Sequence, residues 1–147
     1  MQQSAWPSAL SWDPAAAARL GELHGVLARL GAASSVLLVA GREARAAGWA
    51  AEAAIALTDR AAAARSCALL DLTMNGGELH ERLHAESLEG VADIFLYGAS
   101  LGHVAIRPDG HRFEFAPAGL PADSEMVLTH RRWHRLLTEL HSMSTLM

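Results

Sequence analysis

Residues His80, Glu81 and His84 form the pattern H-E-x-x-H, which many zinc peptidases carry on a helix. There the two histidines lie one turn apart and bind one zinc ion, while the glutamate acts as general base. A catalytic zinc also needs a third protein ligand, and no spacing in this chain singles one out. Arg82 follows the glutamate, where zinc peptidases normally carry an apolar residue. We therefore expect a solvated helix face without zinc, and a small zinc metallohydrolase is the alternative.

Asp71 stands near the end of a short apolar run, Cys67 to Leu72, which predicts a buried strand. Carboxylates at the C-terminal ends of parallel strands line the usual ligand crevice of open α/β sheets. A carboxylate at a strand end can equally cap the turn that follows it. The sequence leaves both interpretations of Asp71 open.

Lysine does not occur in the sequence, and all 12 basic residues are arginine. This excludes a lysine nucleophile, a Schiff-base lysine and the phosphate-binding lysine of a P-loop. The single cysteine, Cys67, excludes an internal disulfide and a multi-cysteine metal site, and it favours a reducing cytoplasm. We expect Cys67 to be an unreactive thiol of the core.

The elements that position these residues belong to a chain of 147 residues, which is the size of one domain. With 51% hydrophobic and 19% charged residues, the chain can build a core. We expect a leader over residues 1–12 and a single α/β domain over 13–147. The net charge of −4 gives no reason to expect a nucleic-acid surface. No apolar run approaches the ~20 residues of a membrane helix, and the N-terminus lacks a signal-peptide pattern.

Apolar spacing and turn residues predict the elements of the first half. Asp13 caps a helix that ends at Gly31. Residues 34–40 (SSVLLVA) form a short apolar run, which predicts a strand buried on both faces. A long alanine-rich helix then runs to about Ala64 and leads to the second strand at 67–72. The order strand, helix, strand predicts a βαβ unit with parallel strands.

The second half begins with a turn at 75–77 and a short helix over 78–85. Residues 100–116 have two interpretations. In one, a helix at 100–106 precedes a strand at 112–116, and in the other a hairpin turns around residues 108–110. A final helix, capped by Asp123 or Ser124, follows to about residue 141.

Four stretches, in this order, resemble the first half of P-loop ATPases of the MinD/ParA class. The likeness is greatest to the cytoplasmic ATPase domain of bacterial exopolysaccharide tyrosine kinases. The first stretch, 34–40, resembles the strand before the phosphate loop, and the second, 51–57 (AEAAIAL), resembles the helix after that loop. The third, 69–73 with Leu79-His80, resembles the strand that carries the D-x-D element and the short helix after it. The fourth, 90–101 (GVADIFLYGASL), is similar to the family's segment G-L-x-D-V-L-x-G-x-x-S-L. Residues 113–119 (FEFAPAG) then resemble the strand ending in P-A-G, and this order favours the helix at 100–106 with the strand at 112–116.

The resemblance spans about residues 34–140 and implies a partial P-loop NTPase fold. Such a fold is Rossmann-like, with a small mostly parallel sheet and flanking helices. The nucleotide-binding positions that the resemblance implies are Gly41, Arg42, Arg45, Gly48 and Asp71.

The segment 41–49 departs from the phosphate-loop pattern G-x-x-x-x-G-K-[ST]. Ala46 and Ala47 stand where the second glycine and the lysine belong, and Thr73 replaces the second aspartate of D-x-D. Phosphoryl transfer depends on positioning and charge neutralisation, and the groups that provide them are missing. ATP hydrolysis is therefore not expected, whereas the sequence leaves other enzymatic activity open through the zinc metallohydrolase alternative.

We therefore expect a pseudo-ATPase, a truncated relative that acts as a protein-binding, scaffold or regulatory module in the cytoplasm. A shortened sheet leaves an unpaired strand edge, and such edges pair with other chains. The expected partner is a protein, for example an intact ATPase of the same class, or a second copy in a homo-oligomer. Nucleic acid and direct membrane insertion are not expected. The alternative is nucleotide binding without hydrolysis, with Arg42 or Arg45 as phosphate ligands for ATP and Mg²⁺.

Overall fold

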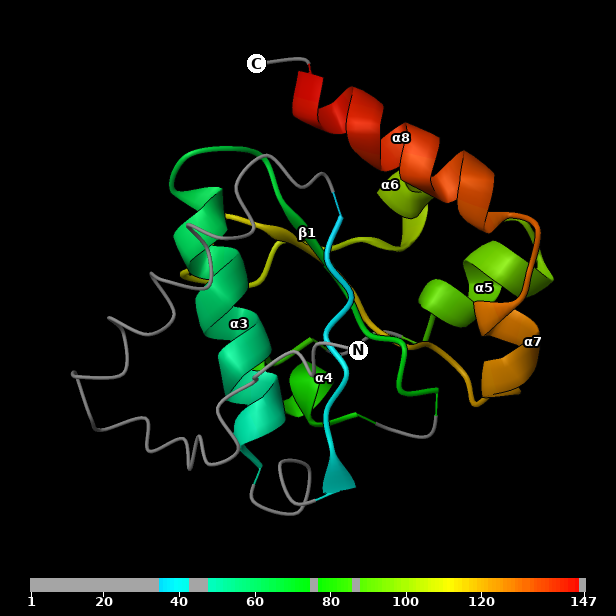
Figure 1. The fold of residues 1–147 in the computed structure, drawn as a ribbon, viewed down its shortest axis with the longest axis horizontal. Helices are drawn as coiled ribbons and strands as arrows, with labels where there is room; N and C mark the ends of the chain where they lie inside the picture. The colour runs from blue at the N-terminus through cyan, green and yellow to red at the C-terminus, as the bar shows by residue number, and fades with distance from the viewer. Residues whose placement is uncertain (1–34, 43–47, 75–76, 86–87, 146–147) are drawn as a thin grey trace, which may run out of the picture.

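The computed structural model describes residues 35–42, 48–74, 77–85 and 88–145 (Figure 1). The predicted leader at 1–12, the predicted helix between Asp13 and Gly31, and Arg45 lie outside the described residues. The described part is a mixed α/β structure with a two-stranded parallel sheet and six helices. This confirms the predicted α/β class with a small parallel sheet and flanking helices.

Two short strands, β1 (Ala68–Leu70) and β2 (Glu114–Ala116), form the parallel sheet. Both lie inside the predicted strands at 67–72 and 112–116. Leu69, Phe115 and Ala116 are buried, as is usual for parallel strands covered by helices, whereas Ala68 and Leu70 are partly buried. The parallel neighbour of β1 is therefore a strand more than forty residues downstream, and the connection between them contains three helices.

On the other side of β2, Phe115 exchanges two backbone hydrogen bonds with Ile106, at 2.7 and 2.8 Å, in a single antiparallel bridge. The helix α6 (Leu101–Val104) comes just before this bridge. The preferred prediction of a helix near 100–106 is thus confirmed, and one pairing of the hairpin alternative is also present. Because α6 ends at Val104, residues 105 and 106 are extended from the helix and Ile106 can pair with Phe115 of β2.

Helices surround the sheet. α3 (Trp49–Ala62) contacts both β1 and the short helix α4 (Glu78–Arg82), whereas α5 (Val91–Leu96) packs against α6. In Figure 1, α3 and α4 lie to one side of the strands, and α5 to α8 lie to the other side or above. Alanine favours α3, because alanine has the highest helix propensity and its small side chain lets the helix approach β1 closely.

The predicted strand at 34–40 is not present in the described residues 35–40, which are extended, unpaired and exposed. The predicted βαβ unit is therefore wrong, because its first strand does not join the sheet. An apolar run becomes a buried strand only where a neighbouring strand supplies hydrogen bonds. No described residue supplies them to this segment.

The predicted final helix is two helices, α7 (Ser124–Leu128) and α8 (Trp133–Thr145). Asp123 caps α7 by accepting a hydrogen bond from the Glu125 N–H at 2.9 Å. The break is stabilised by Trp133, whose indole Nε1 donates to the Val127 carbonyl at 2.8 Å. The apolar spacing of this region runs through the break, so periodicity alone did not locate it.

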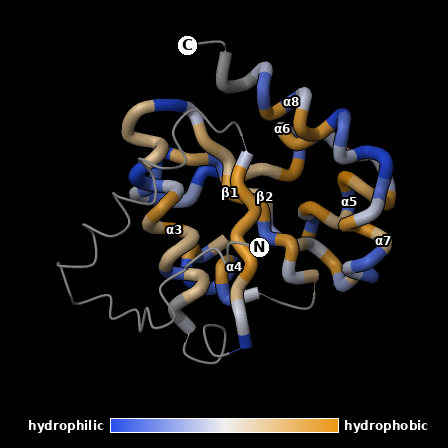
Figure 2. The backbone as a smooth tube through the Cα atoms, in the orientation of Figure 1, coloured by the Kyte–Doolittle hydropathy of each residue, from blue (hydrophilic) through white to orange (hydrophobic). Residues whose placement is uncertain are grey.

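Two apolar clusters form the core. One joins α5, α6, α7 and α8 around Phe95, Val127 and Leu136, and the other joins α3, α4 and the sheet around Phe113 and Phe115. Figure 2 shows hydrophobic residues along the strands and on the segment 35–40 as well. The strands therefore lie between the two clusters. Their position determines where the ends of the sheet contact the helices.

Candidate functional site

Asp71 continues the ladder past the C-terminal end of β1, and its N–H donates to the Ala116 carbonyl at 3.0 Å. The side chain is 1% exposed. Its Oδ1 accepts two hydrogen bonds from Thr73, one from the N–H at 2.9 Å and one from the hydroxyl at 2.6 Å. This geometry is a side-chain turn, so the turn-cap interpretation of Asp71 is confirmed.

The other carboxylate oxygen of Asp71, Oδ2, is buried and has no hydrogen-bond partner among the described residues. A buried oxygen without a partner costs free energy, roughly 1–3 kcal/mol for a neutral group and more for a charged one. Hydrogen bonding at Oδ1 offsets only part of that cost. The unpaired Oδ2 is therefore a physical reason to retain the interpretation that Asp71 contacts a ligand.

Gly77 approaches Asp71 from the N-terminal end of α4. A Cβ at this position would lie well under 3.0 Å from both Asp71 Oδ2 and Thr73 Oγ1, and real Cβ atoms essentially never come so close. Glycine is therefore required here by space and not by backbone conformation. The sequence signal was the turn at 75–77, which does not reveal this contact.

A second close approach lies at the end of β2. The N–H groups of Val91 and Ala92, at the start of α5, donate to the carbonyls of Pro117 and Ala118 at 2.7 and 3.0 Å. Gly90 adjoins this contact, and its N–H donates to Asp93 Oδ2 at 2.7 Å. The resemblance marked both stretches, 90–101 and 113–119, and the structure places them against each other.

The remaining predicted nucleotide-binding residues do not gather around Asp71 in the described part of the chain. Gly41 and Arg42 are exposed, and a Cβ on Gly41 would have no atom within 4 Å. Gly48 precedes α3 in the left-handed conformation, with φ 71°, and its carbonyl accepts from Arg82 Nη2 at 3.1 Å. Gly48 thus contributes to the contact between α3 and α4.

The two histidines of the zinc alternative, His80 and His84, are not arranged as the motif requires. α4 ends at Arg82, and His84 lies beyond it with a positive φ of 50°. His80 and His84 therefore do not occupy successive turns of one helix. Among the described residues, no group of three or more histidine, cysteine, aspartate or glutamate side chains is arranged to hold a metal ion.

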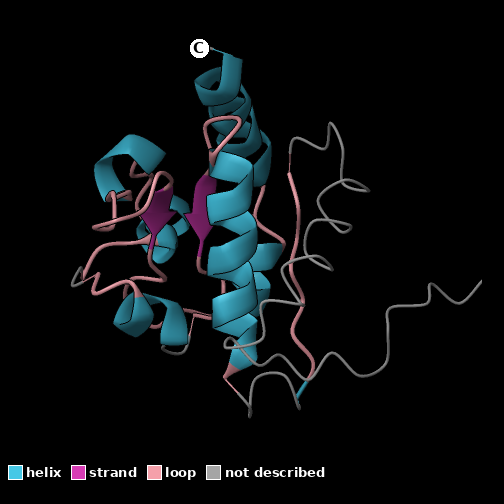
Figure 3. Ribbon diagram, turned by 90° about the vertical axis from the view of Figure 1, so that its left-hand side faces the viewer, coloured by secondary structure: helices cyan, strands magenta, loops and turns pink. Residues whose placement is uncertain are grey.

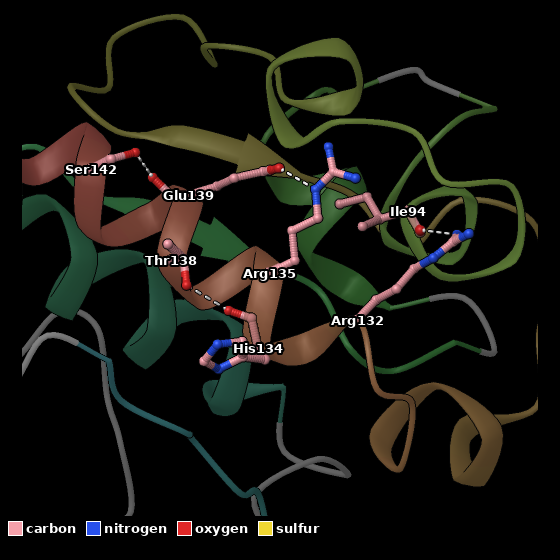
Figure 4. A network of polar contacts seen from close by, with 7 residues as sticks. All are labelled: Ile94, Arg132, His134, Arg135, Thr138, Glu139 and Ser142. Atoms are coloured by element: carbon pink, nitrogen blue, oxygen red, sulfur yellow. Dashed lines mark hydrogen bonds and ion pairs between the residues drawn. The ribbon is translucent and has the colours of Figure 1, made fainter.

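A shallow hollow of about 230 Å³ lies between the C-terminal end of α5 and α8. Arg132 Nη1 donates to the Ile94 and Phe95 carbonyls at 2.9 and 3.0 Å, and Arg135 pairs with Glu139 one turn along α8 (Figure 4). A cation at a helix C-terminus offsets the helix dipole. Both guanidinium groups are thus engaged in structural contacts, and we assign no ligand to this hollow.

The edge of β1 that faces away from β2 is a further candidate surface. The Cys67 carbonyl accepts a hydrogen bond from the Glu114 N–H, and the Asp71 N–H donates to the Ala116 carbonyl. The backbone N–H and C=O groups of residues 67, 69 and 71 therefore face β2. The N–H and C=O groups of Ala68 and Leu70 therefore point outward. No described strand pairs with them, and we call this the open edge of β1.

Burial raises the pKa of the Cys67 thiol, and the nearby Arg65 opposes this shift only in part. We expect iodoacetamide to alkylate Cys67 more slowly in the folded protein than in urea, because the thiolate is the nucleophile. The unfolded chain releases this proton at lower pH, so the free energy of unfolding decreases as the pH rises through the alkaline range. Equal alkylation rates in both states at every pH would contradict the partial burial of this thiol.

No protein-family model matches the chain, and a comparison with curated proteins finds no relative. Within the described residues, no helix combines the length and the apolar character needed to cross a bilayer. The open edge of β1 and the surroundings of Asp71 are therefore the two features from which we infer a function.

Proposed function

We propose that the chain is a protein-binding module on an ATPase-like α/β frame that does not hydrolyse ATP. The observation that carries this proposal is the open edge of β1, whose outward N–H and C=O groups lack a partner in the described structure. Unpaired edges accept extended segments of other chains through main-chain hydrogen bonds. The partner is a protein in the same compartment, which we propose to be the cytoplasm.

The sequence supports the part of the proposal that concerns ATP, namely that the chain does not hydrolyse it. A phosphate loop needs a lysine on the terminal phosphates, and the chain contains none. Arg42, the remaining described cation of that segment, is exposed. Among the residues that the structure describes in this segment, no cation is therefore positioned to stabilise the charge that develops during phosphoryl transfer.

The test has two parts. First, the purified protein should release no phosphate from ATP and Mg²⁺ above the level of an Asp71→Asn preparation. Second, wild-type protein and Ala68→Pro should be used as parallel baits in an extract of the source cells. Proline removes one outward N–H without touching the ladder to β2. A partner that binds the wild type and not Ala68→Pro supports the proposal, and identical captures by both baits contradict it.

Nucleotide binding without hydrolysis is the second candidate, and the buried, unpaired Asp71 Oδ2 favours it. An aspartate at this place suits a magnesium ion held partly by water, whereas the phosphate-binding side lacks its lysine. Titration calorimetry with ATP and Mg²⁺ decides the matter. Heat that disappears in both Asp71→Asn and Arg42→Ala supports this candidate, and the absence of heat at millimolar nucleotide removes it.

A further inference from the structure

The segment 35–40 has the properties of a strand that lacks a neighbour. Its six residues contain no charge, and Val36, Leu37, Leu38 and Val39 are exposed, with 68% of Leu37 and 83% of Val39 accessible. No described residue forms a hydrogen bond with its backbone. Exposed apolar residues scattered singly are ordinary, but four in succession on an extended backbone are typical of a surface that another chain covers.

The position of this segment relative to the sheet is informative. Figure 1 shows it in front of β1, and Figure 3, turned by 90°, shows it on the side of β1 away from β2. It thus lies on the side of the open edge of β1 and does not pair with it. One molecule therefore presents both an apolar extended segment and an edge that lacks a strand.

We propose that two copies of this chain associate by strand addition, with the segment 35–40 of each copy pairing along the open edge of β1 in the other. The two segments then lie side by side about a two-fold axis, and the sheets of both copies join in the order β2, β1, segment, segment, β1, β2. This inference rests on the proposed function and names its partner as a second copy.

Several observations favour a second copy over an unrelated protein. The segment of six residues is long enough to span the open edge, where β1 has three residues and its ladder continues to Asp71. The segment carries no charge to oppose burial beside Leu70, which packs on the apolar core. A two-fold arrangement also satisfies both exposed features of both copies at once, whereas a single foreign strand leaves the apolar segment exposed.

The association is measured by sedimentation velocity over a range of protein concentrations. We expect the wild type to form a dimer that Ala68→Pro weakens by about tenfold or more, which is 1.4 kcal/mol or more. The double variant Leu37→Asp/Val39→Asp should weaken it similarly, because charges would replace buried apolar contacts. Leu88→Asp is the matched control: this leucine is 80% exposed elsewhere on the surface, and its variant should dimerise like the wild type.

A mixing experiment separates this arrangement from any other dimer. Ala68→Pro keeps an intact segment, and Leu37→Asp/Val39→Asp keeps an intact edge. Each alone should sediment as a monomer where the wild type is dimeric, and a dye-labelled sample of one mixed with the other should form a heterodimer through the single complementary contact. Circular dichroism checks that both variants are folded, and the double variant, altered only at exposed residues, keeps the test valid if Ala68→Pro unfolds.

The outcomes distinguish this inference from the proposed function. A monomeric wild type at high concentration, a dimer insensitive to Leu37→Asp/Val39→Asp, or a mixture without heterodimer overturns the second-copy inference. If the double variant is instead destabilised as a monomer, the segment pairs within its own chain, and the inference also fails. In each case a protein captured by wild-type bait and not by Ala68→Pro still supports the proposed function.

Discussion

Gly90→Ala is expected to destabilise the protein by about 3 kcal/mol or more, at the upper end of the range for overpacked sites. A Cβ on residue 90 would lie 2.8 Å from the carbonyl carbon of Ala118 and closer still to the Pro117 carbonyl oxygen and the Gly119 N. All three are backbone atoms, which cannot rotate away. The same contact carries the hydrogen bonds from Val91 and Ala92, so the end of β2 and the start of α5 would separate.

Urea denaturation followed by circular dichroism measures this effect. Gly102→Ala is the matched control, because Gly102 lies within α6 and a Cβ there would meet no atom within 4 Å. Alanine is favoured over glycine inside a helix by roughly 0.5–1 kcal/mol, so this control should be neutral or slightly more stable. Equal stabilities of Gly90→Ala and Gly102→Ala would contradict the close approach at the end of β2.

Gly77→Ala is expected to cost about 2–3 kcal/mol, because its methyl group would overlap the Asp71 carboxylate and the Thr73 hydroxyl. The carboxylate cannot move aside freely, since it is buried and Oδ1 holds two hydrogen bonds from Thr73. The effect is smaller than that of Gly90→Ala because the opposing atoms belong to side chains.

Thermal and urea unfolding of Gly77→Ala measure this cost, and Gly41→Ala is the control, since a Cβ on Gly41 would be free of contacts. Thr73→Ala should cost less in the Gly77→Ala background than in the wild type, because there it also removes one of the two overlaps, and a double-mutant cycle measures this difference. If Gly77→Ala is as stable as Gly41→Ala, then Asp71 Oδ2 is not enclosed by the backbone of residue 77.

Much of the fold could be predicted from local patterns. The strands at 68–70 and 114–116 and the helices α3, α4 and α6 follow from short apolar runs, alanine content and turn residues, which act within a few residues. The segment 35–40 could not be predicted in the same way. Its apolar residues fit a buried strand, but pairing depends on a neighbour that is distant in sequence. Local propensity carries no information about that neighbour.

In the candidate site, too, some features follow from local patterns in the sequence and others depend on contacts that local patterns do not encode. Asp71 was identified by its position at a strand end, and the structure adds that one oxygen caps the turn while the other is unpaired. The role of Gly77 depends on a contact across a turn, which no local pattern encodes. The histidine pair fails because α4 ends at Arg82, and the residue pattern at 80–84 does not indicate that end.

Pairing at the open edge of β1 can be measured by amide hydrogen exchange, resolved to single residues, at low and high protein concentration. We expect Leu69, whose N–H faces β2, to be protected at both concentrations, whereas Ala68 and Leu70 should exchange fast in dilute protein and slowly when partners associate. Fast exchange of Ala68 and Leu70 in the associated state would contradict pairing at the open edge of β1. Strong protection of both in the dilute monomer would show that this edge is already occupied.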